Sequence, residues 1–443
     1  MDNLLVVTSR APFSHHIQGG RNIKVPNVGG VATALNDVLK RYGGTWVCWG
    51  DSRLDREHEE EEVEGYTIRR IYLTVAEKLG FYNGYSNRVL WPLFHYFRDN
   101  IQIDATGFKY YYIANEKFAS AIIEKIDSKT TIWIHDYQLM MIPSILRNMG
   151  VNNNIIFSWH IPWVSPEFFS IIPEGKFLAR SVSKANLITF HIKLYEKNFR
   201  STLEYNNIKL VNHLRTLSVP LGIDTKLYAP LTGKYGLHHM KKVSIIFSID
   251  RMDYTKGLIQ RVKAIDKVLS YRKDLAGKFV YLMNVTPSRA SIPEYDEIKS
   301  QLEMEIGRVN GLYSTATWVP IVYMYRRIPF KSLLTLYSSG DIALITPLVD
   351  GLNLVSKEFV ATTRKGILIL SKFAGAADGL RGALIVNPNN INEIASSIVR
   401  ALEMSSDERK LRLQKMKKHV ISKNSNWWYR RIINAADSNY GNT

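Results

Sequence analysis

Two positively charged side chains follow an apolar stretch in the second half of the chain. Residues 243–249 read VSIIFSI and lead into DRMDYTKG, which places Arg251 and Lys256 just beyond the end of a predicted strand. Ligands of open α/β sheets bind at the carboxyl ends of parallel strands. A guanidinium fork and an ammonium point charge can together neutralise a phosphate or diphosphate. Taken alone, the motif favours an ordinary loop in which Asp250 and Asp253 provide salt-bridge partners.

A second strand-to-helix connection combines glycine with carboxylates. The strand predicted at 341–346 runs into PLVDGLNLVSKEF, with Asp350 and Gly351 ahead of a helix that begins near Leu354. Glycine lets the backbone approach a ligand, and the free amides of a helix start can bind phosphate oxygens. Asp350 can accept hydrogen bonds from sugar hydroxyls, and Glu358 from a ribose. The alternative for Glu358 is an ordinary helix carboxylate.

The first half repeats this arrangement of polar residues at strand ends. Arg10 ends the first predicted strand, and a glycine-rich loop at 27–30 precedes a helix predicted at 32–42. In IHDYQ and SWHIPW, Asp136 and His160 follow two further strands, which places a carboxylate and an imidazole at the same edge of a sheet. A lone histidine at such a position is more often structural.

One segment, FYNGYSNRVLWPLFHY, is unusually rich in aromatic residues. Tyr82 offers a hydroxyl and Trp91 an indole N–H beside flat apolar faces, a combination that suits a sugar phosphate. Packing in a core is the competing interpretation, and the segment alone favours it.

Motifs of metal-dependent and nucleotide-hydrolysing enzymes are missing from the sequence. There is no Walker loop, GxGxxG, GxSxG or HExxH, and no Asp-x-Asp pair to hold a divalent cation against a diphosphate. Cys48 is the sole cysteine, so neither an internal disulfide nor a cysteine-based metal site can form. We therefore expect no metal and no other cofactor, with protein cations and amides neutralising any bound diphosphate.

Composition narrows the class of protein. With 443 residues, 46% hydrophobic and 22% charged, the chain has the balance of a globular enzyme with two domains. No apolar run approaches the ~20 residues of a membrane helix and no secretory signal is recognisable, so we expect a cytoplasmic protein without a membrane partner. The net charge of +18 attracts anions. Scattered basic residues without a nucleic-acid-binding motif favour phosphorylated metabolites over nucleic acid. The other alternative is a basic surface without a specific role.

Short apolar runs alternate with amphipathic stretches along the whole chain, which predicts an α/β fold of doubly wound sheets. The predicted strands begin at Leu4, Trp46, Thr131, Ile155 and Leu187, then at Val243, Phe279, Val319, Ile342, Ile367 and Leu384. The segment 222–242, rich in glycine and without periodicity, reads as a linker. We expect domains at 1–225 and 226–405, followed by helices at 406–443 that return to the first domain. The acidic run at 59–62 is expected to form a solvated turn.

These segments, in this order, resemble the trehalose-6-phosphate synthases, retaining glycosyltransferases of family 20. The resemblance spans Leu4 to about Trp428 and is carried by YNGYSNRVLWPLFHY, HDYQL, HIPWVSPEFF, DRMDYTKG, TPSR with EIGRVNG, TPLVDGLNLVSKEF and SKFAGAADGLRGALIVNP. It implies the GT-B architecture, in which two Rossmann-like domains face a central cleft. It further implies a nucleotide-activated glucose and glucose 6-phosphate as substrates. Uridine is the expected base of the donor, with guanosine and adenosine open.

The resemblance also implies roles for individual residues. Arg251 and Lys256 are similar to the pair that binds the donor diphosphate, and His160 and Asp350 to residues that hold the transferred glucose. The other implied donor-binding positions are Gly30, Leu352, Asn353, Leu354, Val355 and Glu358. The implied acceptor-binding positions are Arg10, Tyr82, Trp91, Asp136 and Arg289. A departure from the family pattern is His191, which stands where a glutamine is common.

The implied reaction is transfer with retention and without a protein nucleophile. Since no phosphatase-like segment follows, the expected product is trehalose 6-phosphate itself. Two alternatives stay open: transfer to another phosphorylated acceptor such as glycerol 3-phosphate, and a non-catalytic sugar-phosphate-binding protein. The sequence also leaves a homo-oligomer open.

Overall fold

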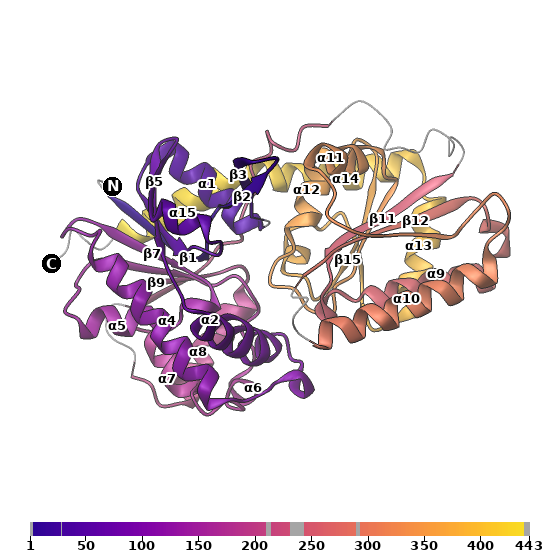
Figure 1. The fold of residues 1–443 in the computed structure, drawn as a ribbon. Helices are drawn as coiled ribbons and strands as arrows, with labels where there is room; N and C mark the ends of the chain where they lie inside the picture. The colour runs from indigo at the N-terminus through magenta and orange to yellow at the C-terminus, as the bar shows by residue number, and fades with distance from the viewer. Residues whose placement is uncertain (1–2, 28, 210–213, 231–242, 289–292, 438–443) are drawn as a thin grey trace. The chain divides into compact units, whose positions relative to one another are not determined.

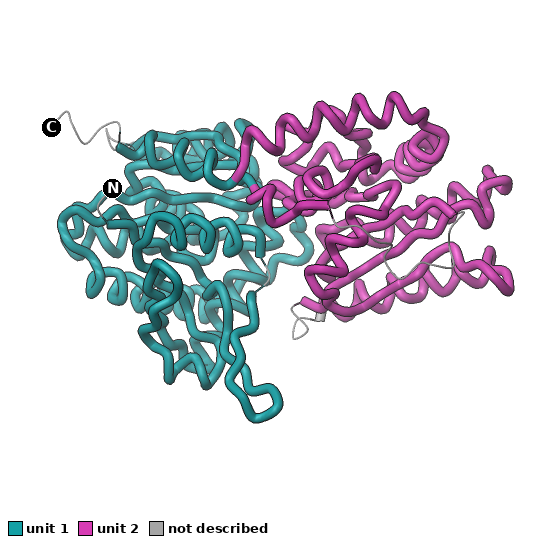
Figure 2. The backbone as a smooth tube through the Cα atoms, turned by 90° about the horizontal axis from the view of Figure 1, so that it is seen from above, with its two compact units in different colours: residues 1–222, 425–443 teal, residues 223–424 magenta. Residues whose placement is uncertain are grey.

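The computed structural model describes residues 3–27, 29–209, 214–230, 243–288 and 293–437. The chain forms two compact units (Figure 2). Unit 1 comprises residues 1–222 and 425–443, and unit 2 comprises residues 223–424. Each unit contains its own sheet and its own apolar core.

The sheet of unit 1 has the strand order β10-β9-β8-β7-β1-β4-β6-β5 and is parallel except for β5. Its strands are β1 (Leu4–Arg10), β4 (Thr45–Trp49), β5 (Glu60–Val63), β6 (Tyr66–Ile71), β7 (Thr131–His135), β8 (Ile155–Ser158), β9 (Leu187–Phe190) and β10 (Arg215–Ser218). The central strands are apolar throughout because helices cover both faces of a parallel sheet. The chain runs outward from β1 in one direction and then returns to β7 on its other side, so the strand order reverses between β1 and β7.

The helices of unit 1 include one element from the far end of the chain. They are α1 (Gly30–Tyr42), α2 (Val75–Lys78), the π-helix η2 (Leu79–Leu90), α3 (Trp91–Phe94), α4 (Ala105–Ile123), α5 (Ile142–Asn148), α6 (Pro166–Phe169), α7 (Gly175–Val182), α8 (Lys193–Tyr205) and α15 (Ser425–Asp437). A separate hairpin pairs β2 (Phe13–Gln18) with β3 (Arg21–Pro26). Trp428 of α15 is 1% exposed and packs 5.0 Å from Trp133, which anchors the last helix on this sheet (Figure 1).

The sheet of unit 2 is entirely parallel, with the order β13-β12-β11-β14-β15-β16. Its strands are β11 (Ser244–Arg251), β12 (Phe279–Thr286), β13 (Ile321–Tyr325), β14 (Ile342–Ile345), β15 (Ile367–Ser371) and β16 (Leu384–Val386). The order reverses between β11 and β14, which makes that boundary the switch point where doubly wound sheets bind ligands.

Two groups of helices accompany this sheet (Figure 1). One group is α9 (Leu258–Tyr271), α10 (Pro293–Tyr313) and α13 (Ile391–Glu403), and the other is α11 (Phe330–Ser339), α12 (Leu354–Thr362) and α14 (Ser406–Ser422). Apolar residues at helical spacing explain the packing of α13, whose Ile394 and Ile398 are fully buried.

The strands predicted from the sequence are confirmed, and so is the α/β fold class with two Rossmann-like units. Most begin at the expected residue; β4 and β11 differ by one position and β13 by two. The expectation for 59–62 is wrong, because Glu60–Val63 forms the edge strand β5. Glutamates are tolerated there since an edge strand leaves side chains in water and Lys125 pairs with Glu60 at 2.6 Å.

The expected tail at 406–443 divides between the two units. Helix α14 packs against α12 in unit 2, whereas α15 packs against α1 in unit 1. The change of unit falls between Asn424 and Ser425, where Ser425 Oγ donates to Asp37 Oδ2 at 3.1 Å. Among the described residues, every helix is too short or too polar to cross a bilayer.

Gly257 joins the loop after β11 to α9, and its backbone lies close to Thr346. Its φ is 66°, and a Cβ at this position would lie 2.4 Å from the carbonyl oxygen of Thr346. Gly277 has a similar φ of 75° with nothing within 4 Å of a Cβ. We expect Gly277→Ala to lower the free energy of unfolding by about 1 kcal/mol from backbone strain alone. Gly257→Ala should cost about 1–3 kcal/mol more, because the backbone must move. Urea unfolding of both variants measures the difference, and equal losses would contradict the close approach.

Candidate active site

The loops after β11 and β14 meet through an ion pair at the switch point of unit 2. Lys256 Nζ lies 2.7 Å from Asp350 Oδ2, and both side chains are mostly buried. Arg251 is the last residue of β11, on the same edge. Asp250 does not supply the salt bridge considered for this loop, since it pairs with Arg261 on α9. The structure therefore brings three of the predicted catalytic residues to one edge of one sheet.

Asp350 is held as a carboxylate by its neighbours. Its Oδ1 accepts the backbone N–H of Leu352 at 3.2 Å, and its Oδ2 accepts the side-chain amide of Asn353 at 3.2 Å. Burial raises the pKa of Asp350, but Lys256 and these hydrogen bonds more than offset burial, so the pKa lies below its ordinary value. The group is consequently charged and fixed in orientation at neutral pH.

A buried arginine supports both loops. Arg261 is 0% exposed and pairs with Asp250. It also donates to Thr346 Oγ1 at 3.1 Å and to the carbonyl of Lys256 at 2.7 Å. One guanidinium thus fixes the end of β11, the end of β14 and the backbone that carries Lys256.

Helix α12 begins at Leu354, where the sequence predicts a helix start. Asn353 has a φ of 74° and caps the helix by accepting the backbone N–H of Ser356 at 3.0 Å. Leu354 and Val355 are the first residues of the helix, where backbone amides lack partners within the helix. Leu352 is 4% exposed, so its side chain serves the core while its backbone lies in the loop. Such a helix start can hold an anion.

Glu358 is bound by two tyrosines of unit 2. Its carboxylate accepts the hydroxyls of Tyr228 at 3.1 Å and Tyr337 at 2.9 Å. Burial raises the pKa of Glu358, and the two hydroxyls only partly counteract this. Glu358 is therefore a carboxylate oriented by two hydrogen bonds, with a pKa above its ordinary value.

In unit 1, Arg10 and Tyr82 lie together at the end of β1. The guanidinium carbon of Arg10 is 4.6 Å from the ring centre of Tyr82 and 5.5 Å from that of Trp49. Arg10 remains 42% exposed and has a weak contact with Asp51 at 3.5 Å. An exposed cation framed by aromatic rings can bind an anionic group of a ligand.

Trp91 occupies a more enclosed position than Tyr82. It is 6% exposed and packs on His95 at 4.0 Å and on Tyr137 at 5.8 Å between ring centres. Tyr82 lies in the π-helix η2, and Trp91 begins α3 directly after this π-helical segment. Such segments are frequent at functional sites.

Asp136 and His160 lie at the carboxyl ends of neighbouring strands, as predicted. Asp136 has a φ of 74°, a rare conformation for a residue other than glycine. Its Oδ1 accepts the backbone N–H of His160 at 3.3 Å. Strain of this kind persists only where the surrounding structure enforces it, and it is common in active sites.

The ring of His160 lies between two other histidines. Its Nε2 is 2.9 Å from His135 Nδ1, and its Nδ1 is 3.3 Å from His191 Nε2. Burial lowers the pKa of His160 to about 3, so the ring is neutral at physiological pH.

Gly30 is the first residue of α1, whose capping residue, Gly29, leaves the helix start without a side-chain cap. Arg289 lies outside the described residues. Within the described ranges, no three His, Cys, Asp or Glu side chains gather into a possible metal site.

Sequence reasoning missed two residues beside Arg10. Trp49 ends β4, and Lys78 Nζ lies 5.3 Å from the centre of its ring. The strand-end rule that selected Arg10 would also have selected Trp49. Lys78 gave no such signal, because its proximity depends on the path of the chain through α2.

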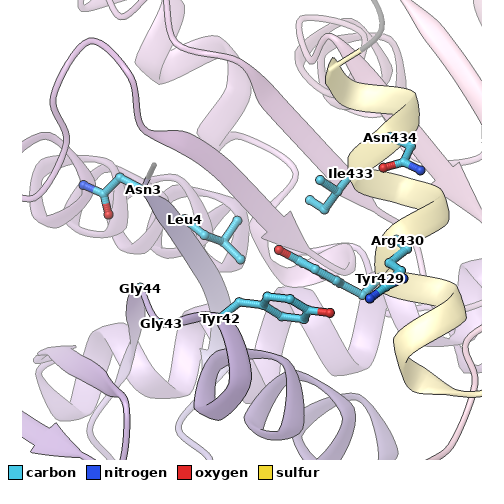
Figure 3. A pocket seen from close by; sticks show the side chains of 9 residues that line it. All are labelled: Asn3, Leu4, Tyr42, Gly43, Gly44, Tyr429, Arg430, Ile433 and Asn434. Carbon is cyan, nitrogen blue, oxygen red and sulfur yellow. The ribbon is translucent and has the colours of Figure 1, made fainter. Parts of the chain in front are cut away.

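Unit 1 contains a cavity of about 290 Å³ (Figure 3). It is lined by Asn3, Leu4, Tyr42, Gly43, Gly44, Tyr429, Arg430, Ile433 and Asn434. Leu4 begins β1 whereas Arg10 ends it, so the cavity is at the opposite edge of the sheet. It includes none of the predicted site residues that the structure describes.

Two Rossmann-like units, each with polar residues gathered at the switch point of its sheet, define a glycosyltransferase of the GT-B class. The sequence profile of glycosyltransferase family 20 matches residues 2–220 and 234–438. The chain belongs to glycosyltransferase family 20.

Known relatives cover nearly all of the chain. It is 33% identical to the α,α-trehalose-phosphate synthase [UDP-forming] of Candida albicans over 96% of this chain and 95% of that protein. It is 36% identical to the bifunctional trehalose-6-phosphate synthase/phosphatase of Thermoproteus tenax, over 94% of this chain but only 61% of the larger protein.

Solved structures are similarly close. The α,α-trehalose-phosphate synthase of Burkholderia xenovorans in complex with glucose-6-phosphate matches with a TM-score of 0.90 and 30% identity, covering 98% of this chain and 100% of that one. A structure from E. coli bound with UDP-2-fluoro glucose matches with a TM-score of 0.91 and 32% identity, covering 98% and 99%.

The raised pKa of Glu358 predicts a stability cost above acidic pH. The pKa of the Glu358 carboxyl in the folded protein exceeds its ordinary value of 4.5. Above pH 4.5 the carboxyl therefore ionises more readily in the unfolded chain than in the folded protein, and this difference destabilises the fold. The cost is absent at low pH and develops as the pH rises from 4.5 through the folded pKa. We compare the free energy of unfolding of Glu358→Gln with that of the native chain. We expect this difference to favour the variant more at about pH 7.5 than at about pH 4.5.

Urea unfolding at both pH values measures this gain. The matched control is Glu297→Gln, which removes the same charge from an exposed position on α10. A Glu358→Gln variant that follows the control at both pH values would show that the carboxylate is not strained.

Proposed function

We propose that this protein is a retaining glucosyltransferase that makes trehalose 6-phosphate from UDP-glucose and glucose 6-phosphate, without a metal ion. The observation that carries the proposal is the pairing of Lys256 with Asp350 beside Arg251 and the start of α12. This places fixed cations, a carboxylate and helix amides at one switch point. Membership of family 20 and the likeness to UDP-forming synthases support the same reaction.

The donor binds to unit 2 in this proposal. Arg251, Lys256 and the backbone from Leu352 to Val355 hold the diphosphate. Glu358, oriented by its tyrosines, accepts hydrogen bonds from the ribose. Asp350 and His160 hold the glucose that is transferred.

The acceptor binds to unit 1. Arg10 binds the phosphate of glucose 6-phosphate, since its guanidinium is exposed and framed by Tyr82 and Trp49. Trp91 and Arg289 complete that set, and Asp136 contacts the acceptor sugar. A three-carbon acceptor would leave this aromatic surface largely unused, which disfavours glycerol 3-phosphate.

The reaction proceeds on one face of the donor sugar. The bond from the anomeric carbon to the diphosphate oxygen breaks, and the anomeric hydroxyl oxygen of the acceptor bonds to that carbon from the same side. The acceptor proton passes to the departing diphosphate. Arg251, Lys256 and the α12 amides stabilise the charge that develops there, and binding supplies orientation.

A matrix of donors and acceptors tests the proposal. Purified protein with excess chelator is supplied with UDP-, GDP- or ADP-glucose and with glucose 6-phosphate, fructose 6-phosphate or glycerol 3-phosphate, and products are identified by mass and NMR. We expect trehalose 6-phosphate and UDP, with retained α-configuration, undiminished by the chelator. Lys256→Ala, purified identically, controls for contaminating activity.

Two outcomes would overturn the proposal. Turnover with another acceptor but not with glucose 6-phosphate would assign a different product. Binding of glucose 6-phosphate without turnover on any donor would identify a sugar-phosphate-binding protein instead of an enzyme.

A further inference from the structure

Three buried histidines form a continuous row across three neighbouring strands of unit 1. His135 ends β7, His160 follows β8, and His191 follows β9. Their exposed fractions are 2%, 8% and 5%. The ring nitrogens are separated by 2.9 Å between His135 and His160 and by 3.3 Å between His160 and His191. The row is thus a hydrogen-bonded chain inside the protein.

A backbone amide fixes the direction in which hydrogen bonds are donated along the histidine row. The N–H of Leu221 donates to His191 Nδ1 at 3.4 Å, so that nitrogen must be unprotonated. A neutral imidazole carries one proton, which must then be on His191 Nε2. His191 therefore donates to His160 Nδ1, and His160 Nε2 in turn donates to His135 Nδ1. The opposite direction would require His191 to accept at both nitrogens, which only an imidazolate can do.

The surroundings keep the rings of His135 and His160 neutral. Burial lowers the pKa of His160 to about 3, and burial together with His160 lowers the pKa of His135 well below its ordinary value. The ring centre of Trp428 lies 6.4 Å from that of His135 and 6.5 Å from that of His160, so an aromatic side chain packs beside the row. A charged imidazole would be strongly disfavoured there.

His135, at the far end of the histidine row, shows the consequence of this direction of hydrogen bonding. In the part of the chain that the structure describes, His135 Nε2 is buried without a hydrogen-bond partner. Since His135 Nδ1 accepts from His160, its proton is on this Nε2. A buried donor without an acceptor is unfavourable by about 1–3 kcal/mol, so the amide of Leu221 imposes the arrangement against a local cost.

We propose that His191 is a positioning residue that fixes the ring orientation and the Nε2–H tautomer of His160. His160 also donates its backbone N–H to Asp136, whose own conformation is strained. The histidine row therefore holds both residues assigned to the sugars, and its effect on the reaction rests on the proposed function. The assignment of the tautomers does not depend on the proposed function.

Nitrogen NMR of the free protein tests the tautomers directly. With ¹⁵N-histidine labelling, long-range proton–nitrogen correlations distinguish protonated from bare ring nitrogens, and single variants assign each signal. We expect His135, His160 and His191 all to be neutral with the proton on Nε2. An Nδ1–H form at any of the three would overturn the proposal, whatever reaction the protein catalyses.

Kinetics of two variants test the positioning role. Leucine at 191 removes both contacts, whereas glutamine keeps one acceptor for Leu221 and one donor for His160. We expect His191→Leu to lower kcat by about 10- to 100-fold with little change in KM, because misplacement affects the transition state most. His191→Gln should recover most of this loss. His16→Leu, at an exposed position of β2, is the control for removing a histidine.

The two sets of measurements separate the possible failures. If His191→Gln is as slow as His191→Leu, or if neither differs from the native chain, His191 does not position His160. If the native chain has no transferase activity but the predicted tautomers are observed, the proposed function fails while the directed histidine chain stands.

Discussion

A single buried guanidinium holds together the edge of unit 2 that carries the candidate active site. Arg261 contacts Asp250, Thr346 and the backbone of Lys256, and these belong to the ends of the two strands that flank the switch point. The amide of Leu348 also donates to the carbonyl of Thr255 at 2.7 Å, so the two loops share backbone contacts. Breaking one partner from a buried ion pair costs about 3–5 kcal/mol, which makes this network a constraint on the fold as well as on the loops.

The functional groups of both units are held in unfavourable states. Burial raises the pKa of Glu358, Asp136 and Asn353 adopt left-handed conformations, and His135 retains a buried donor. Each state is one that an isolated peptide would avoid, and each adjoins a predicted ligand group. The rigid parallel sheets make this possible, since their buried strands supply the stability that these positions lose.

The sequence predicts the sheets and the polar residues at their strand ends well, because both depend on local pattern. Apolar runs identified the central strands, and polar residues immediately after them gave Arg251, Lys256, Asp350 and Asp136. The pairings that tune these groups depend on residues distant in sequence. Arg261 looks like any helix residue, and the two tyrosines beside Glu358 are 130 and 21 positions away from it.

Errors in the prediction have similar physical origins. The glutamates at 60–62 form a strand because pairing with β6 outweighs their low strand propensity. His160 seemed a lone histidine, since the row with His135 and His191 exists only once three parallel strands align. The segment 406–443 belongs to both units because its two helices pack on different units. Trp428 of α15 packs on Trp133 in unit 1, whereas α14 packs on α12 in unit 2.

The central claim is that fixed side-chain charges and amides, with no bound cation, hold the donor diphosphate. Calorimetric titration of UDP into chelator-treated protein tests it most directly, comparing the native chain with Arg251→Ala/Lys256→Ala. Two charge-assisted hydrogen bonds contribute about 1.5–3 kcal/mol each, so the double variant should bind at least about 100-fold more weakly. Lys263→Ala/Lys267→Ala, which removes equal charge from exposed positions of α9, should bind like the native chain. Binding that requires added Mg²⁺, or that survives in the Arg251 and Lys256 variant, would contradict the account.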